Sequence, residues 1–133
     1  MNIMATTGTF EIYTNAWKRN SPGTVALTES DGRYHATFRK EIGVKAHTEL
    51  KISFPKILEL KQLDVREFSG FLNVRSDDVM MSYIAVEGTL TAWIGVGDIA
   101  VNAMFNMKMK RDDTSDPQGP DVVTVHGILS LAN

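Results

Sequence analysis

Strict alternation of apolar and polar residues is the feature that most constrains the fold of this chain. From Val44 to Phe54, every second residue is apolar apart from Thr48, and the residues between them carry charged or polar side chains. Successive side chains of a strand point to opposite faces, so the pattern predicts a strand with one buried and one solvated face. A helix would instead scatter these charges around its circumference.

The same period of two recurs near the C-terminus. From Ile99 to Lys110 an apolar residue occupies every second position, although Ala and Met favour helices intrinsically. Because the period is stronger evidence than single-residue preference, we predict a strand here. The segment from Val122 to Leu131 alternates in the same way and is predicted to form the last strand.

Turn residues join other segments into hairpins. Ser30-Asp31-Gly32 separates the segments 24–29 and 33–38, and its glycine can adopt the positive φ that a tight turn requires. Further short strands are expected at Thr9–Tyr13 and Val79–Val86. A separate strand over 89–94 should then pair with the one that begins at Ile99.

Two stretches leave alternatives open. Residues 55–69 fit two strands, Lys56–Leu60 and Arg66–Val74, about as well as a helix, and we favour the strands. The residues Ser76-Asp77-Asp78 could cap a short helix that begins at Val79, which leaves helix or strand open for 77–86.

These elements predict one all-β domain over residues 1–133. We expect about eight to nine antiparallel strands in a single barrel or a two-sheet sandwich, with at most one short helix. Residues 1–8 are expected to form a flexible tail. Residues 111–120, rich in Asp, Pro and Gly, are expected to form a mobile acidic loop.

Composition excludes several classes of protein. The chain has no cysteine, which excludes disulfides, thiolate catalysis and thiolate metal sites. No signal-peptide pattern and no apolar run of about 20 residues occurs, so we expect a cytoplasmic protein without membrane contact. Residues 1–66 hold 10 Lys and Arg against 7 Asp and Glu, and residues 67–133 hold 4 against 9. The resulting net charge of −2 argues against nucleic acid as a partner.

Sequence motifs give little support for catalysis. Residues Gly95 to Ala100 match the dinucleotide fingerprint, but the next segment alternates like a strand, so we interpret them as a hairpin turn and expect no cofactor. His35, His47 and His126 lack the spacing of metal ligands, and no metal site is expected. An enzyme is therefore disfavoured, and a hydrolase or isomerase that uses His126 with a carboxylate is the weakest of our hypotheses.

The candidate contact site is a loop with an aromatic residue beside two cations: Trp17, Lys18 and Arg19. Such residues can anchor a protein contact, although Trp17 could instead fold back over one end of the barrel. Exposed strand edges can pair with another chain. We therefore predict a non-enzymatic binding or structural interaction module that contacts a protein partner or a second copy of itself.

The alternative hypothesis is a carrier of an apolar small molecule. Five of the seven methionines fall between positions 80 and 109, and unbranched Met side chains suit an adaptable apolar pocket. The candidate lining of such a pocket is Met81, Trp93, Phe105 and Met107. Ordinary core packing explains the same residues.

Overall fold

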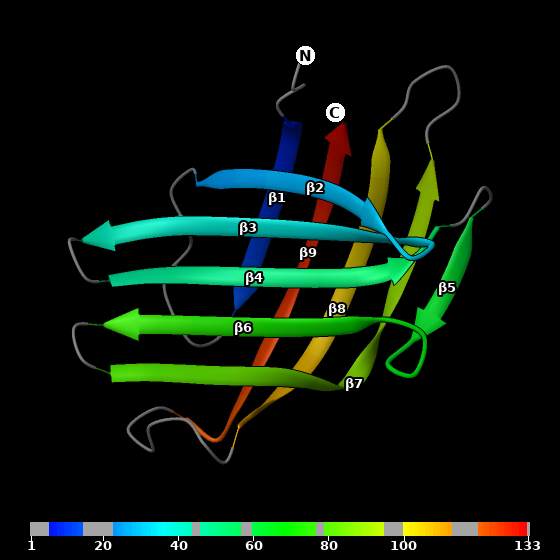
Figure 1. Cartoon of the computed structure of the whole chain (residues 1–133). Coiled ribbons are helices and arrows are strands. Elements are labelled where there is room, and N and C mark those ends of the chain that lie inside the picture. Colours follow the sequence, from blue (N-terminus) through cyan, green and yellow to red (C-terminus); the bar gives the residue numbers. More distant parts are fainter. Residues whose placement is uncertain are drawn as a thin grey trace.

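The protein folds as one antiparallel sheet that curls into a nearly closed barrel (Figure 1). The computed structural model describes residues 6–14, 23–43, 46–56, 60–76, 79–94, 100–112 and 120–132. The strands are β1 (Thr7–Thr14), β2 (Thr24–Ser30), β3 (Arg33–Gly43), β4 (Ala46–Pro55), β5 (Lys61–Asp64), β6 (Ser69–Ser76), β7 (Val79–Ile94), β8 (Val101–Arg111) and β9 (Val122–Ala132). No helix occurs among the described residues, so the predicted all-β class is confirmed.

The order of the strands across the sheet is β1-β9-β8-β7-β6-β4-β3-β2, and β5 pairs with β7. In Figure 1, β2, β3, β4 and β6 form one layer, which crosses a second layer of β1, β9 and β8 at a steep angle. β7 runs from the first layer into the second. The two ends of this path are β1 and β2, and the Leu27 amide of β2 donates a hydrogen bond to Oγ1 of Thr6, the residue before β1, at 2.9 Å.

β7 is a single strand of 16 residues, whereas the sequence predicted two separate strands over 79–86 and 89–94. The described strand also rules out the helix that was the alternative for 79–86. The interruption between the two expected strands is a register shift between Ala85 and Glu87, which leaves Val86 unpaired. A β-bulge of this kind bends a strand without ending it, and it lies where β7 turns from one layer toward the other.

Residues 55–69 contain strand and turn in their described part. β4 ends at Pro55, β5 covers 61–64 and β6 begins at Ser69. The expected strand Lys56–Leu60 is wrong at both described ends, and residues 57–59 lie outside the described residues. The expected strand Arg66–Val74 corresponds to β6, which begins three residues later. Asp64 explains the turn at 65–67, since its carbonyl oxygen accepts the backbone N–H groups of Glu67 and Phe68 at 2.9 and 3.2 Å. Its carboxylate also accepts the N–H of Arg66 at 2.8 Å.

The chain ends differ from expectation in one respect. β1 begins at Thr7, so residues 7 and 8 belong to a strand rather than to the expected tail. Residues 1–5 and most of the expected acidic loop, residues 113–119, lie outside the described residues.

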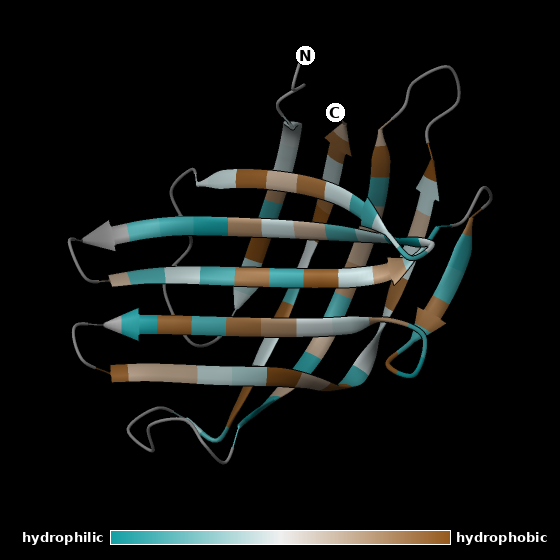
Figure 2. Ribbon diagram, in the orientation of Figure 1, coloured by the Kyte–Doolittle hydropathy of each residue, from teal (hydrophilic) through white to brown (hydrophobic). Residues whose placement is uncertain are grey.

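The period-two pattern is confirmed by burial. Along β8 the side chains alternate between buried and exposed or half-buried for ten residues, and the ribbon of β4 in Figure 2 alternates in hydropathy. In β4, Leu50, Ile52 and Phe54 are at most 1% exposed. The buried faces of the two layers meet in one apolar core. Within the described segments, no helix is long and apolar enough to cross a bilayer.

Candidate functional site

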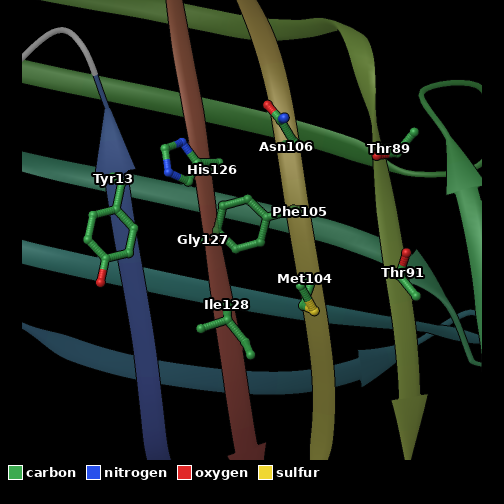
Figure 3. Close-up of a pocket in the computed structure, with 9 residues that line it drawn as sticks. All are labelled: Tyr13, Thr89, Thr91, Met104, Phe105, Asn106, His126, Gly127 and Ile128. Atoms are coloured by element: carbon green, nitrogen blue, oxygen red, sulfur yellow. The ribbon is translucent and has the colours of Figure 1, made fainter.

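A groove with a volume of about 510 Å³ lies on the outer face of the second layer, away from the core (Figure 3). Four strands contribute to it: β1, β9, β8 and β7. The residues that line the groove are Tyr13, Thr89, Thr91, Met104, Phe105, Asn106, His126, Gly127 and Ile128.

Strand register arranges most of these residues in two parallel rows. The first row, which we call the polar row, crosses four strands through consecutive cross-strand partners: Tyr13, His126, Asn106 and Thr89. The second row lies two residues away from the first on β9, β8 and β7 and consists of Ile128, Met104 and Thr91. The groove therefore has one mainly polar and one mainly apolar side.

Phe105 and Gly127 are cross-strand partners in the floor between the two rows. A Cβ atom on Gly127 would lie 1.9 Å from the backbone oxygen of Glu11 and 2.9 Å from Cζ of Phe105. Only glycine therefore allows β1 to approach β9 this closely. Gly127 also makes room for the Phe105 ring, which packs edge-on against Phe10 with ring centroids 5.9 Å apart.

The rings of Tyr13 and His126 stack at one end of the groove. Their centroids are 5.4 Å apart and their planes differ by 18°. The two residues are direct cross-strand partners on β1 and β9, which explains the stacking. His126 lies exposed on the outer face, whereas the hydrolase or isomerase hypothesis requires a deep polar cleft around this ring.

Two side chains of the groove lining are of an ionisable type, the imidazole of His126 and the phenol of Tyr13. The nine lining residues include no Asp, Glu, Lys or Arg. An ion pair lies beside the polar row on β7 and β8, two residues from Thr89 and Asn106, where Lys108 Nζ is 4.0 Å from Glu87 Oε2. Among the described residues, no group of three or more His, Asp or Glu side chains could hold a metal ion.

The structure distributes the sequence-predicted pocket residues over both faces of the sheet. Phe105 and Met107 are core residues that are 4% and 0% exposed, and Met81 packs against the same core. Trp93 is half-buried and pairs with Asn102. It lies on the opposite face, because its chain neighbour Ala92 points into the core. The four residues are therefore not brought together around one space.

The candidate contact residues Trp17, Lys18 and Arg19 lie outside the described residues. Of the groove residues, the sequence analysis had singled out only Phe105 and His126. One signal was present in the sequence: Met104 is a large apolar residue at a position that alternates with the buried ones, between Asn102 and Asn106. Its neighbours in the groove come from three other strands, and sequence alone does not supply that register.

No protein-family model matches the chain, and no curated protein or solved structure matches it either. The fold and the site together define an all-β, barrel-like domain with an uncharged two-sided groove on its outer face.

Proposed function

We propose that this protein is a non-enzymatic binding module that holds an uncharged, hydroxyl-rich ligand in the outer groove. A short neutral saccharide is the chemical class that fits the groove best. The observation that carries the proposal is the pairing of a polar row with an apolar row in a groove whose lining includes no carboxylate and no Lys or Arg.

The size of the groove suits a small ligand. Its volume of about 510 Å³ falls within the range of roughly 300 to 1,000 Å³ that is typical of small-molecule sites. The polar row crosses four strands, and three strand spacings correspond to about 14 Å. A ligand of one to two sugar rings would occupy that length.

The polar row favours a ligand with many hydroxyl groups. The amide of Asn106 can donate and accept hydrogen bonds, and the hydroxyls of Thr89 and Thr91 can do either. A purely apolar ligand would remove these groups from water without replacing their hydrogen bonds, at a cost of about 1–3 kcal/mol each. A charged ligand would find no opposite charge in the lining.

The apolar row favours a ligand that also has a non-polar face. Met104 is 54% exposed and Ile128 is 37% exposed, so both present apolar surface to the groove. The C–H face of a pyranose ring can pack on such side chains while its hydroxyl edge reaches the polar row. The adaptable Met side chain allows more than one ring stereochemistry.

The test is a titration of ¹⁵N-labelled protein with three neutral disaccharides: maltose, cellobiose and lactose. We expect amide shift changes for at least one of them that cluster at Asn106, His126 and Met104. Asn106→Leu should weaken the binding of that sugar about tenfold or more, because a lost hydrogen bond in a desolvated site costs about 1.4 kcal/mol or more.

Thr37→Val is the matched control for Thr89→Val. Thr37 is a half-buried threonine on β3 in the other layer, outside the groove. We expect only the Thr89 variant to weaken sugar binding. Shift changes that spread evenly over the protein, or equal effects of the two variants, would contradict the proposal.

The competing function is a carrier that holds an apolar molecule inside the barrel. Against it stands the packing of Phe105 and Met107 within the shared core. Native mass spectrometry distinguishes the two functions. A co-purifying apolar mass, retained by the Asn106→Leu variant, would favour the carrier.

A further inference from the structure

A second exposed surface combines apolar and basic residues on the outer face of β4, β6, β7 and β8. Lys51 on β4, Phe71 on β6, Ile84 on β7 and Lys110 on β8 are consecutive cross-strand partners. We call these four residues the basic–apolar row. None of them lines the groove described above.

The apolar members of this row point away from the core. Phe71 is 48% exposed and Ile84 is 41% exposed, whereas their chain neighbours Leu72 and Tyr83 are 0% and 2% exposed. Val122, the cross-strand partner of Lys110, extends the apolar surface and is 40% exposed. Exposed apolar side chains that adjoin one another in this way are typical of contact surfaces.

The lysines give this surface a positive charge at both ends of the apolar pair. The Lys51 side chain is 57% exposed and lies 3.5 Å from Glu49, a carboxylate that also pairs with Arg39 at 3.4 Å. Lys110 is exposed and has no ion pair within the described part of the chain. A partner that brings carboxylates to both ends would complement this pattern.

We propose that the basic–apolar row docks an extended polypeptide segment of the pattern acid–x–apolar–x–acid. Lys51 and Lys110 are three strand spacings apart, which corresponds to about 14 Å. In an extended peptide, residues i, i+2 and i+4 point to the same side, and residues i and i+4 are about 13 Å apart. The two acids of the segment would therefore reach the two lysines, and its central side chain would pack between Phe71 and Ile84.

The shape of the apolar part favours polypeptide over nucleic acid. Single-stranded nucleic acids bind on aromatic rings that stack with successive bases. Phe71 is the one aromatic residue of the row. Its cross-strand partner Ile84 is aliphatic, as is Val122 beyond Lys110. Aliphatic side chains pack well on a Leu, Ile or Val of a partner but give no stacking surface.

The experiment is an NMR titration of the whole chain with the peptide Ac-Ser-Glu-Thr-Leu-Thr-Glu-Ser-NH₂. We expect shift changes at the amides of Phe71 and Ile84, and an affinity that falls as salt is raised, because exposed charge pairs are screened. A peptide of the same composition with adjacent acids, Ac-Ser-Glu-Glu-Leu-Thr-Thr-Ser-NH₂, should bind at least fivefold more weakly.

Charge reversal provides the decisive comparison. The double variant Lys51→Glu, Lys110→Glu should bind the acidic peptide at least tenfold more weakly than the parent protein does. It should instead bind a counterpart peptide in which Lys replaces both Glu. Lys61→Glu is the control, because Lys61 is similarly exposed but lies on β5, outside the row. Phe71→Ser leaves the charges in place and should weaken binding of the acidic peptide.

Three results would overturn the proposal. The first is equal binding of the two acidic peptides, and the second is an unchanged affinity in the double variant. The third is a preference of the row for another partner. A (dT)₁₀ oligonucleotide that binds more tightly than the peptide would indicate nucleic acid, and a dimer in solution that Lys110→Glu dissociates would indicate a second copy.

Discussion

Two adjacent residues of β9 offer a direct test of the alternating fold. Leu129 is completely buried, whereas Ile128, its chain neighbour, is 37% exposed on the opposite face and lines the groove. We expect Leu129→Ala to destabilise the protein strongly and Ile128→Ala to destabilise it little. The two substitutions remove similar numbers of atoms, so the difference reports which face each residue occupies.

The magnitude follows from burial. Replacing a fully buried Leu by Ala costs about 3–5 kcal/mol, from lost transfer free energy and from the cavity left behind. An unfolding entropy of about 2.1 cal/mol/K per residue gives about 0.28 kcal/mol/K for 133 residues. Leu129→Ala should therefore lower the Tm by about 11–18 °C. Ile128→Ala should cost at most about 1 kcal/mol, or about 4 °C.

Urea denaturation and differential scanning calorimetry measure these effects, and the saccharide titration adds a second readout. Ile128→Ala should weaken binding in the groove while the protein stays folded, and Leu129→Ala should not change affinity at temperatures where it remains folded. Similar losses of stability in the two variants would refute the assignment of faces in β9. The positions of both the core and the groove depend on that assignment.

Three further perturbations address other parts of the structure. Gly127→Ala should separate β1 from β9 and expose the β1 amides to hydrogen exchange, because its Cβ would meet the Glu11 carbonyl oxygen at 1.9 Å. Gly32→Asn, at an open turn position with φ 73°, is the control and should change the Tm little. Burial raises the pKa of the Tyr83 hydroxyl, Arg111 opposes the rise and Asp121 adds to it; the hydroxyl also donates to the Pro120 carbonyl at 2.9 Å. The tyrosine of an unfolded chain ionises near pH 10. The neutral, buried Tyr83 hydroxyl should therefore contribute fully to the free energy of unfolding below about pH 10, and this contribution should be lost as pH rises through the pKa of Tyr83 in the folded protein. Denaturation of Tyr83→Phe should show a shallower alkaline loss of stability than the parent. Arg66→Ala should raise the pKa of Asp64 in an NMR titration, because hydrogen bonds from the Arg66 side chain and backbone hold that pKa below its usual value. An unchanged Asp64 titration would mean that the ion pair does not persist in solution.

Period and turn chemistry sufficed to predict much of the fold. The alternation in 46–55, 101–111 and 122–132 specified both strand and buried face, because a single-residue shift would place the whole apolar set in water. The hairpin at Asp31-Gly32 followed from its residues, and both have positive φ. Strand ends were less predictable where a turn depends on hydrogen bonds to one carboxylate, as at Asp64.

The candidate site was beyond the reach of sequence because it depends on pairing between distant strands. Tyr13 and His126 are cross-strand partners, yet 113 positions separate them in the chain. The periodicity of each segment says which side chains share a face, but not which strand lies beside it. Trp93 illustrates the limit. The sequence analysis grouped it with Phe105 and Met107, but the face of β7 on which Trp93 lies depends on the bulge at 85–87, because one extra residue moves all later side chains of the strand to the other face.

The same bulge explains how two surfaces can share two strands without overlapping. Ile84 of the basic–apolar row precedes the bulge, whereas Thr89 of the polar row follows it. Both side chains lie on the outer face, because their chain neighbours Tyr83 and Leu90 are 2% and 0% exposed. β7 itself runs from one layer into the other (Figure 1). On β8, Lys110 and Asn106 are four residues apart, which corresponds to about 13 Å along a strand. A saccharide in the groove and a peptide on the row would therefore occupy separate surfaces, and saturating one site should leave the affinity of the other unchanged.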